Sequence, residues 1–377
     1  MQTPIKCVLM RGGTSRGPYF KDGDLPADME TRKQVLLRVM GSPHIRQIDG
    51  IGGSDPVTSK VAVVRKSMRA DADVDYLFSQ VWVDRAEVDT SPSCGNILTG
   101  VGPFAIDEGL VAAQDGETRV RIFDVNTNSL VEAVVQTPGG RVDYEGTHRI
   151  DGVNDAYAPI QLDFKAMVGA KTGKLFPTGQ RAEEINGVRV SCVDMAMPIV
   201  FVPAQQVGKT GYETKIELDT DRQLLATLEK IRLIAGERMG FGDVTGRVIP
   251  KIALVAPPCA GGTIASRYFM PHAIATAYAV TGGVCLSTAS CIPGTVAYDV
   301  AALSQAADGV THIAIEHPQG KMFVDVKVQD KDGSVVVEQA SLVRHARRLM
   351  AGEVYVPSTV WTGPQTSGLI EKTREMA

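Results

Sequence analysis

Residues 93–111 read SCGNILTGVGPFAIDEGLV, a stretch of mainly small and apolar residues that follows a turn containing Pro92 and opens a helix. A second stretch of this composition, HAIATAYAVTGGVCLSTA, covers residues 272–289 and predicts another helix. Helices of small and apolar residues can each serve as the core of a domain. The sequence therefore predicts two central helices, one in each half of the chain.

The segments around these helices are mostly strand-like. Apolar runs separated by glycine-rich turns predict strands at residues 5–10, 59–64, 76–83, 119–123 and 130–136. Helical periodicity also occurs at residues 29–40 and 221–236. The predicted class is mixed α/β, in the α+β sense.

The best candidate for a domain boundary is the polar segment 165–187, which is rich in glycine and lysine and has strand-like runs on both sides. A cut at its end gives an N-terminal domain of residues 1–186 and a C-terminal domain of residues 187–377. Each half has one Gly-Gly-Thr tripeptide, at residues 12–14 and 261–263. A tripeptide is too short to distinguish internal duplication from chance.

The composition indicates a folded globular protein. The chain has 377 residues, 44% hydrophobic and 22% charged, which excludes a disordered or low-complexity class. Lys and Arg number 39 against 43 Asp and Glu, without long basic runs, so nucleic acid is not an expected partner. The N-terminus lacks a signal-peptide pattern, and no apolar stretch reaches the roughly 18–20 residues of a membrane span. We expect a cytoplasmic protein with no membrane partner.

Familiar cofactor and nucleophile motifs are absent from the sequence. The glycine runs at residues 50–53 and 240–242 lack the spacing of a dinucleotide fingerprint, and no phosphate-binding loop is present. The six histidines include no H-E-x-x-H pair, the six cysteines no C-x-x-C pair, and Gly-x-Ser-x-Gly does not occur. We expect no nucleotide cofactor, no metal and no disulfide scaffold.

Ser93, Cys94, Gly95 and Asn96 lie where the first predicted central helix begins. Free N–H groups at a helix start favour a bound anion, and the positive helix end favours thiolate over thiol at Cys94. Cys94 is therefore a candidate for acid–base chemistry. The alternative is a small, buried, hydrophobic cysteine before a helix.

Lys60 lies at the mouth of the apolar strand predicted at residues 59–64. A partly desolvated lysine loses proton affinity and can act as a general base near neutral pH. A solvated lysine at a strand end is the alternative.

Two further segments have side chains suited to carboxylates. Arg11, Thr14 and Ser15 lie in the glycine-rich segment after the first predicted strand, where guanidinium and hydroxyl groups can bind a carboxylate. Arg267 and His272 precede the second predicted central helix, whose N-terminus could receive an anion. The alternatives are a simple turn and a helix cap with a surface arginine.

Four longer motifs are similar to those of one known family. They are MRGGTSRG at residues 10–17, GSPHIRQIDGIGGSDPVTSKVAVV at 41–64, SCGNILTGVGPFAIDEGLV at 93–111 and IEHPQG at 315–320. On these motifs, nearly the whole chain resembles the PrpF-like isomerases. This group contains 2-methylaconitate isomerase, methylitaconate delta-isomerase and 4-oxalomesaconate tautomerase.

The resemblance implies a diaminopimelate-epimerase-like fold with two similar domains, each a curved mixed sheet around a central helix, and an active site in the cleft between them. It also implies catalysis without a metal or organic cofactor. In that chemistry a lysine and a cysteine, which match Lys60 and Cys94 here, move a proton across an allylic system beside carboxylates. Diaminopimelate epimerase uses one cysteine from each domain, and the second-domain position here falls at His272.

The second half departs from the 4-oxalomesaconate tautomerases in two places. Residues 194–198 read DMAMP where those enzymes carry DNGMP, and residues 176–180 read FPTGQ where they carry LPxGN. The N-terminal motifs favour that branch of the family, with Met197 as a substrate contact. The departures leave 2-methylaconitate, methylitaconate and aconitate as alternative substrates.

The sequence therefore predicts an isomerase that moves a C=C bond in an unsaturated di- or tricarboxylate. Lys60 is the expected base and Cys94 the proton donor or relay, and which of them takes the first proton stays open. The expected substrate-binding residues are Arg11, Thr14, Ser15, Ser93, Gly95, Asn96, Met197, Arg267 and His272. The rival hypotheses are an α-carbon epimerase or racemase and a non-catalytic carboxylate-binding protein. A homodimer is expected from size and family habit.

Overall fold

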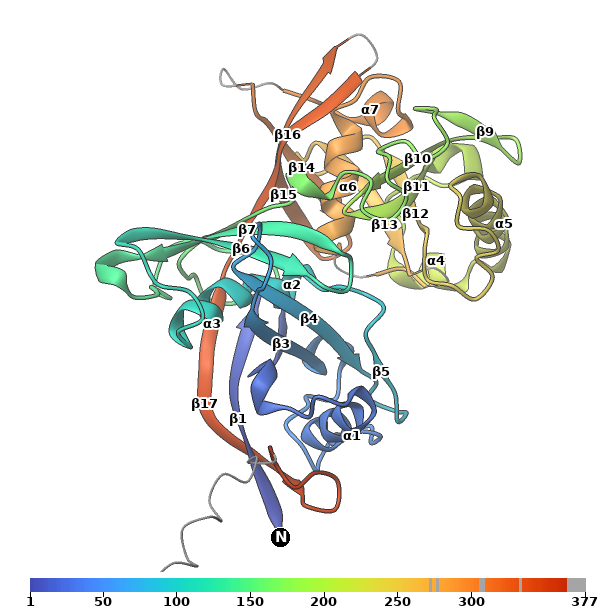
Figure 1. Ribbon diagram of the computed structural model, residues 1–377. Coiled ribbons are helices and arrows are strands. Elements are labelled where there is room, and N and C mark those ends of the chain that lie inside the picture. The colour runs from blue at the N-terminus through green and yellow to red at the C-terminus, as the bar shows by residue number, and fades with distance from the viewer. Residues whose placement is uncertain (271–272, 276–277, 305–308, 332–333, 365–377) are drawn as a thin grey trace, which may run out of the picture.

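The computed structural model describes residues 1–270, 273–275, 278–304, 309–331 and 334–364. These residues form a mixed α/β structure in which strands predominate, as predicted (Figure 1). The strands make one continuous series of hydrogen-bonded neighbours. Among the described residues, no helix has both the length and the apolar character needed to cross a membrane.

The first half begins with a strand hairpin and ends at a short strand that connects it to the second half. Its strands are β1 (Gln2–Gly12), β2 (Ser15–Lys21), β3 (Lys60–Lys66), β4 (Val74–Val81), β5 (Val88–Asp89), β6 (Gly116–Asp124), β7 (Ser129–Thr137) and β8 (Ile160–Asp163). Its helices are α1 (Met29–Met40), α2 (Gly95–Thr99) and α3 (Val101–Asp107), with the 3-10 turns η1 (Asp22–Asp24), η2 (Pro56–Thr58), η3 (Pro138–Gly140) and η4 (Lys165–Met167). The five strands predicted here are all present as β1, β3, β4, β6 and β7.

Helix α1 shows how local sequence sets its bounds. The Asp28 carboxylate accepts the N–H of Thr31 at 2.8 Å and so caps the start of the helix. The helix ends at Gly41, whose φ of 76° suits a residue without a side chain. The prediction of a helix at residues 29–40 is confirmed.

The second half has the same kinds of element and adds two long strands at its end. Its strands are β9 (Glu183–Ile185), β10 (Val188–Met195), β11 (Met197–Pro203), β12 (Lys251–Ala256), β13 (Ile264–Phe269), β14 (Thr311–His317), β15 (Gly320–Lys331), β16 (Ser334–Arg344) and β17 (Ala346–Pro357). Its helices are α4 (Lys215–Thr220), α5 (Arg222–Arg238), α6 (Val280–Ser290) and α7 (Val296–Val300), with the 3-10 turn η5 (Ala204–Val207).

The two halves repeat one order of strand pairing. In the first half, β1 is antiparallel to β2, β2 parallel to β3, β3 antiparallel to β4, β4 parallel to β6 and β6 antiparallel to β7. In the second half, β10 to β15 follow the same alternation. The central helices α2 and α6 fall at the same place in both series, before the fifth strand. Strand pairing therefore shows an internal duplication.

The Gly-Gly-Thr tripeptides do not mark that duplication. The first forms the turn between β1 and β2, whereas the second lies between β12 and β13, which corresponds to the connection of β3 with β4. The two tripeptides therefore do not occupy equivalent positions in the structural repeat.

Two strands tie the halves together. Strand β8 pairs with β7 on one side and with β16 on the other. Strand β17 returns from the second half to pair with β1 along its length (Figure 1). The domain cut at residue 186 stays a prediction.

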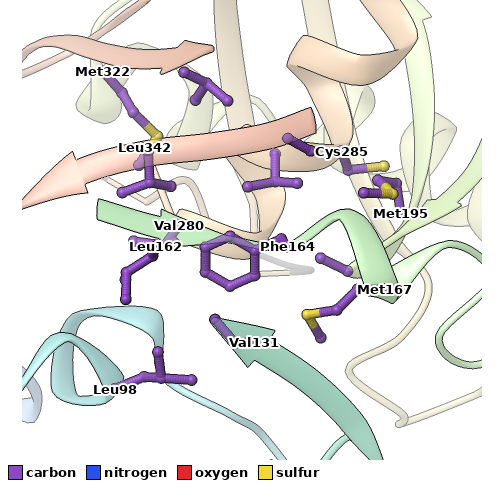
Figure 2. Packing of buried hydrophobic residues seen from close by; sticks show 14 of the residues in the cluster. Leu98, Val131, Leu162, Phe164, Met167, Met195, Val280, Cys285, Met322 and Leu342 are labelled. Carbon is purple, nitrogen blue, oxygen red and sulfur yellow. The ribbon is translucent and has the colours of Figure 1, made fainter. Parts of the chain in front are cut away.

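One hydrophobic cluster spans both halves. Leu98 of α2, Val131 of β7, Phe164, and Val280 and Cys285 of α6 all belong to this cluster, and Figure 2 shows them in one view. All residues of α6 are buried, which confirms that this small-residue helix lies at the centre of its half. The starts of α2 and α6 touch, because a Cβ atom added to Gly95 would lie 2.6 Å from the Cβ of Val280.

The second central helix begins later than predicted. The sequence predicts it from about residue 272, but α6 begins at Val280. The N–H of Ile274 donates to the Asp219 carboxylate at 2.8 Å, and that of Ala275 donates to the carbonyl of Tyr268 at 2.8 Å. These N–H groups are engaged outside any helix, and Ile274 forms a β-bridge with Phe269. The composition of the segment does not reveal that these partners compete with helix formation for the N–H groups.

Candidate active site

Lys60 is the first residue of β3 and is held by a neutral partner. Its Nζ donates to Oε1 of Gln80 at 2.7 Å and lies 5.0 Å from the centre of the Phe78 ring. The Gln80 amide is oriented by its own nitrogen, which donates to the carbonyls of Ser59 at 2.9 Å and Pro56 at 3.1 Å. In the described part of the chain, Lys60 forms no ion pair with a carboxylate. The lysine is therefore half-buried and positioned by an amide.

Cys94 directly precedes α2, as predicted, and is half-buried with a free thiol. Its carbonyl accepts the N–H of Leu98 at 2.9 Å, which starts the helical hydrogen bonds, and the hydroxyl of Tyr76 at 3.3 Å. Burial raises the pKa of Tyr76 and Tyr19 well above the usual value, and the proximity of Cys94 adds to both shifts. Cys94 thus lies beside two phenols that stay neutral.

Lys60 and Cys94 share one face of the first sheet. Side chains alternate along a strand, so Lys60 points to the same side as Ala62 and Val64. Those two residues and Phe78 belong to the core cluster formed with Ile97 and Leu98 of α2. The structure therefore brings the predicted lysine and cysteine to the face that α2 covers.

The turn between β1 and β2 packs on the start of α2. The Asn96 side chain donates from Nδ2 to Oγ1 of Thr14 at 3.1 Å, and the Thr14 N–H donates to Oδ1 of Asn96 at 3.4 Å. A Cβ atom on Gly12 would lie 2.2 Å from the Asn96 carbonyl oxygen, and one on Gly13 would lie 2.1 Å from Oδ1. The glycines of the predicted motif are therefore required for this close approach.

Arg11 and Ser15 support the turn from within. Nη1 of Arg11 donates to the carbonyls of Gly13 at 2.8 Å and His345 at 3.1 Å, and the guanidinium lies 4.7 Å from the centre of the Tyr157 ring. Burial lowers the pKa of Arg11. Ser15 is buried. Substrate contact by either residue stays a prediction.

Ser93 anchors the segment in front of Cys94. Its hydroxyl donates to the carboxylate of Asp124, which is 1% exposed and also accepts the N–H groups of Asn126 and Thr127. Burial raises the pKa of Asp124. The Ser93 oxygen is therefore engaged with the protein, and Gly95, the next small residue, is packed against Val280.

A cavity of about 710 Å³ adjoins this region. Thr14 and Asn96 line it from the first half, and Tyr278, Met322 and Arg344 line it from the second. Among the described residues, Lys60 and Cys94 are not in its lining, although Asp55 and Val57, which lead into Lys60, are. The volume suits a small organic acid, since ligand pockets measure roughly 300–1,000 Å³.

Arg267, a predicted substrate-binding residue of the second half, lies away from this cavity. Arg267 on β13 donates to the carbonyls of Glu213 at 2.8 Å and Ser266 at 3.1 Å, and burial lowers its pKa. The neighbours of Arg267 on the strand, Ser266 and Tyr268, contact Tyr278 on the opposite face. The structure does not bring Arg267 to the cavity.

Met197 and His272 complete the predicted set. Met197 begins β11, directly after Ala196, whose φ of 62° makes the tight connection to β10. It is half-buried against the core cluster. His272 lies outside the described residues. The roles of both residues stay predictions.

Sequence reasoning missed Gln80, Tyr278 and Arg344. A signal for Gln80 exists, because pairing the two predicted strands as a hairpin places it opposite Lys60. Tyr278 and Arg344 reach the cavity through long-range packing, which no local pattern marks.

Metal-ligating and thiol side chains are dispersed over the described residues. No three His, Cys, Asp or Glu side chains there are grouped as metal ligands. Burial raises the pKa of Cys7 and Cys291 to about 11, and Cys285 is wholly buried. Cys94 differs from these three because it precedes a helix that adjoins the cavity.

Comparisons with known proteins agree with this architecture. The family model described as PrpF protein matches residues 2–357. The (4E)-oxalomesaconate Delta-isomerase of Novosphingobium sp. (strain KA1) is 50% identical over 350 residues, which cover 93% of this chain and 97% of that protein. A methylitaconate-delta-isomerase crystal structure matches with a TM-score of 0.83 and 40% identity, over 95% of this chain and 97% of that chain.

A more distant structure shares the fold alone. The hydroxyproline epimerase of Agrobacterium vitis matches with a TM-score of 0.55 and 13% identity, over 94% of this chain and 93% of that chain. Together with the methylitaconate-delta-isomerase, it confirms the predicted diaminopimelate-epimerase-like fold.

Proposed function

The chain belongs to the PrpF protein family, a family with isomerase members, and from this premise we propose that it moves a C=C bond in an unsaturated di- or tricarboxylate by allylic proton transfer. We propose 4-oxalomesaconate as the favoured substrate. The 50% identity to an enzyme named for oxalomesaconate supports this choice over methylitaconate, for which the matching structure is 40% identical.

The observation that carries the proposal is the pairing of Lys60 with a neutral amide. Because Gln80 offers an amide oxygen and not a carboxylate, the Lys60 nitrogen can take up and release a proton without breaking an ion pair. The amide still fixes the position of the nitrogen, which a proton transfer from carbon requires. Lys60 is the proposed base.

Cys94, which precedes the helix on the Lys60 side of the first sheet, is the proposed proton donor. Lys60 removes a proton from one carbon of the allylic system, and the electron pair delocalises through the double bond onto a carboxylate. The Cys94 thiol then gives its proton to the carbon two positions away, and the C=C bond has moved. Lys60 ends with one proton more and Cys94 with one fewer, and exchange with solvent restores both.

Thr14 and Asn96 are the proposed stabilisers of the intermediate. The dienolate formed after proton removal carries extra negative charge on carboxylate oxygens. Thr14 and Asn96 line the cavity and hold each other through hydrogen bonds, so their polar groups are already fixed before charge develops. By helix geometry the N–H groups of the first turn of α2 have no acceptor within the helix, and we include them among the proposed donors.

Proton NMR in deuterated water tests the proposal. The protein is incubated separately with 4-oxalomesaconate, 2-methylaconitate, methylitaconate and aconitate, and both bond position and deuterium uptake are followed. We expect bond migration in 4-oxalomesaconate, with deuterium entering at the migrating position. Exchange without migration would favour an epimerase, and saturable binding with neither would favour a carboxylate-binding protein.

A further inference from the structure

Arg344 points into the cavity without a carboxylate partner. It is the last residue of β16, lines the cavity and is only partly exposed. Its side chain donates from Nη1 to the carbonyl of its neighbour Val343 at 3.0 Å. Among the described residues, no carboxylate lies within ion-pair distance of its guanidinium, and Asp151 is the one acid whose charge affects it.

The other charged groups along the cavity are engaged. Lys321 donates from Nζ to the carbonyl of Ala260 at 2.5 Å, and Asp325 bonds Nδ1 of His312 at 2.7 Å. Asp151 accepts the backbone N–H of Lys321 at 2.9 Å. Partial removal of a guanidinium from water raises its free energy unless an anion compensates the charge. The part of the cavity wall at Arg344 is therefore suited to an anionic group.

The main chain connects Arg344 to the turn that holds Thr14. The carbonyl of His345, the next residue, accepts the N–H of Gly13 at 3.0 Å and Nη1 of Arg11 at 3.1 Å. Thr14 and Asn96 line the same cavity as Arg344. A ligand in this cavity can therefore be reached by Thr14 and Asn96 of the first half and by Arg344 of the second.

We propose that Arg344 binds a substrate carboxylate in this cavity and makes the site selective for acids with an additional carboxylate. This inference rests on the proposed function, because it assigns a contact to the substrate of that reaction. Arginine suits the task, since its planar fork can donate two parallel hydrogen bonds to one carboxylate. Burial lowers the pKa of Arg344 to about 10, so the group is charged at neutral pH. Arg267, the sequence candidate for this role, is bonded to carbonyls on the other face of β13.

Calorimetric titration with two unreactive acids tests this inference. Tricarballylate has three carboxylates and no double bond, and glutarate has the same chain length with two. The proteins compared are the wild type, Arg344→Gln, Arg344→Lys and Arg149→Gln. Arg149 lines the same cavity but is exposed and donates to the carbonyl of Asn154 at 2.9 Å, so its loss controls for the removal of one positive charge.

We expect Arg344→Gln to raise the Kd of tricarballylate at least about tenfold and that of glutarate less than about threefold. Arg344→Lys should retain part of the preference, and Arg149→Gln should leave both affinities within about threefold. Thermal unfolding should show no loss of stability in Arg344→Gln, because no protein carboxylate loses its partner.

Three outcomes would overturn the inference. They are unchanged tricarballylate binding in Arg344→Gln, equal weakening in Arg344→Gln and Arg149→Gln, and no tricarballylate binding by the wild type. The isomerase proposal fails separately, through absence of bond migration in the NMR experiment. A protein that binds tricarballylate through Arg344 and moves no double bond would keep the carboxylate site and lose the reaction.

Discussion

The two halves of the molecule share an order of strand pairing but differ at the positions that carry the proposed chemistry. The third strand of each series, β3 and β12, begins with a lysine, Lys60 in the first half and Lys251 in the second. The residue before the central helix is Cys94 in the first half and Ala279 in the second. Only the first half therefore combines a lysine at the start of its third strand with a thiol directly before its central helix.

The two lysines have different surroundings. Lys60 is half-buried and bonded to Gln80 on the neighbouring strand. Lys251 is 6% exposed, and burial lowers its pKa to about 8. The register of β12 with β13 leads to Met270, an apolar residue, at the position that corresponds to Gln80. The duplicated fold thus supplies two similar positions, and the polar partner makes only one of them suitable for positioned proton transfer.

The largest expected effect comes from replacing each of the two lysines. We expect Lys60→Met to lower kcat by about a thousandfold or more, since a positioned base contributes roughly 10²–10⁴ to the rate. Lys251→Met should keep kcat within about threefold. The readout is bond migration followed by NMR, with circular dichroism as the check on folding. Lys60→Met activity above about a tenth of the wild type would remove Lys60 from the role of base.

Replacing the thiol gives the next largest effect. Cys94→Ala should lower kcat by roughly a hundredfold, because the carbon that receives the proton loses its donor, while Lys60 can still exchange the first proton. Deuterium uptake should therefore fall less than bond migration. Cys291→Ala, a change at the end of α6, is the matched control and should leave both rates unchanged. Equal losses of exchange and migration in Cys94→Ala would contradict the separate role of the thiol.

The site residues that the sequence predicts are those whose neighbours along the chain form a recognisable pattern. Lys60 begins an apolar strand and Cys94 precedes an apolar helix, so a break in the apolar pattern marks each of them. Thr14 and Asn96 lie in glycine-rich motifs, and the close contacts of Gly12 and Gly13 explain those glycines. The strands of the first half follow from their apolar runs for the same reason.

The residues that were missed depend on which distant segments meet. Arg344 reaches the cavity because β8 joins β16 to the first half and because the main chain of His345 bonds the turn at Gly13. The sequence predicts the start of α6 too early, because Asp219 and Tyr268 bind the N–H groups of Ile274 and Ala275. A single segment of sequence does not show that distant residues will bind N–H groups that a helix would otherwise use.

The buried lysine predicts a difference in pH dependence between the wild type and Lys251→Met. In the folded protein Lys251 loses its proton near pH 8, whereas in the unfolded chain it does so near 10.5. Between these values the unfolded chain binds more protons, so wild-type stability rises with pH. Relative to Lys251→Met, the wild type should gain about 3 kcal/mol in the free energy of unfolding over that range.

Urea unfolding of both proteins from pH 7 to 10.5 measures this effect. Other groups titrate in both proteins, so the difference between the two curves isolates Lys251. Parallel curves would mean that the second lysine is not desolvated and that the two halves differ less than their contacts indicate.

The smallest expected effect tests the contact between the halves. An alanine Cβ at position 95 would lie 2.6 Å from Cβ and Cγ1 of Val280, so the starts of α2 and α6 must move apart. Gly95→Ala should lower the free energy of unfolding by about 1–3 kcal/mol, the usual cost of overpacking. It should also slow bond migration, because Cys94 immediately precedes the displaced helix start. Gly23→Ala is the control, since a Cβ there meets nothing within 4 Å.

A double-mutant cycle decides whether the clash with Val280 is the cause. Val280→Gly removes the whole opposing side chain, so the double variant should be less destabilised than the sum of the single changes. Additive losses would place the effect of Gly95→Ala inside the first half. Coupling would show that α6 of the second half positions the start of α2, and with it the proposed proton donor Cys94. The second half would then be needed for a site whose proposed catalytic residues all lie in the first half.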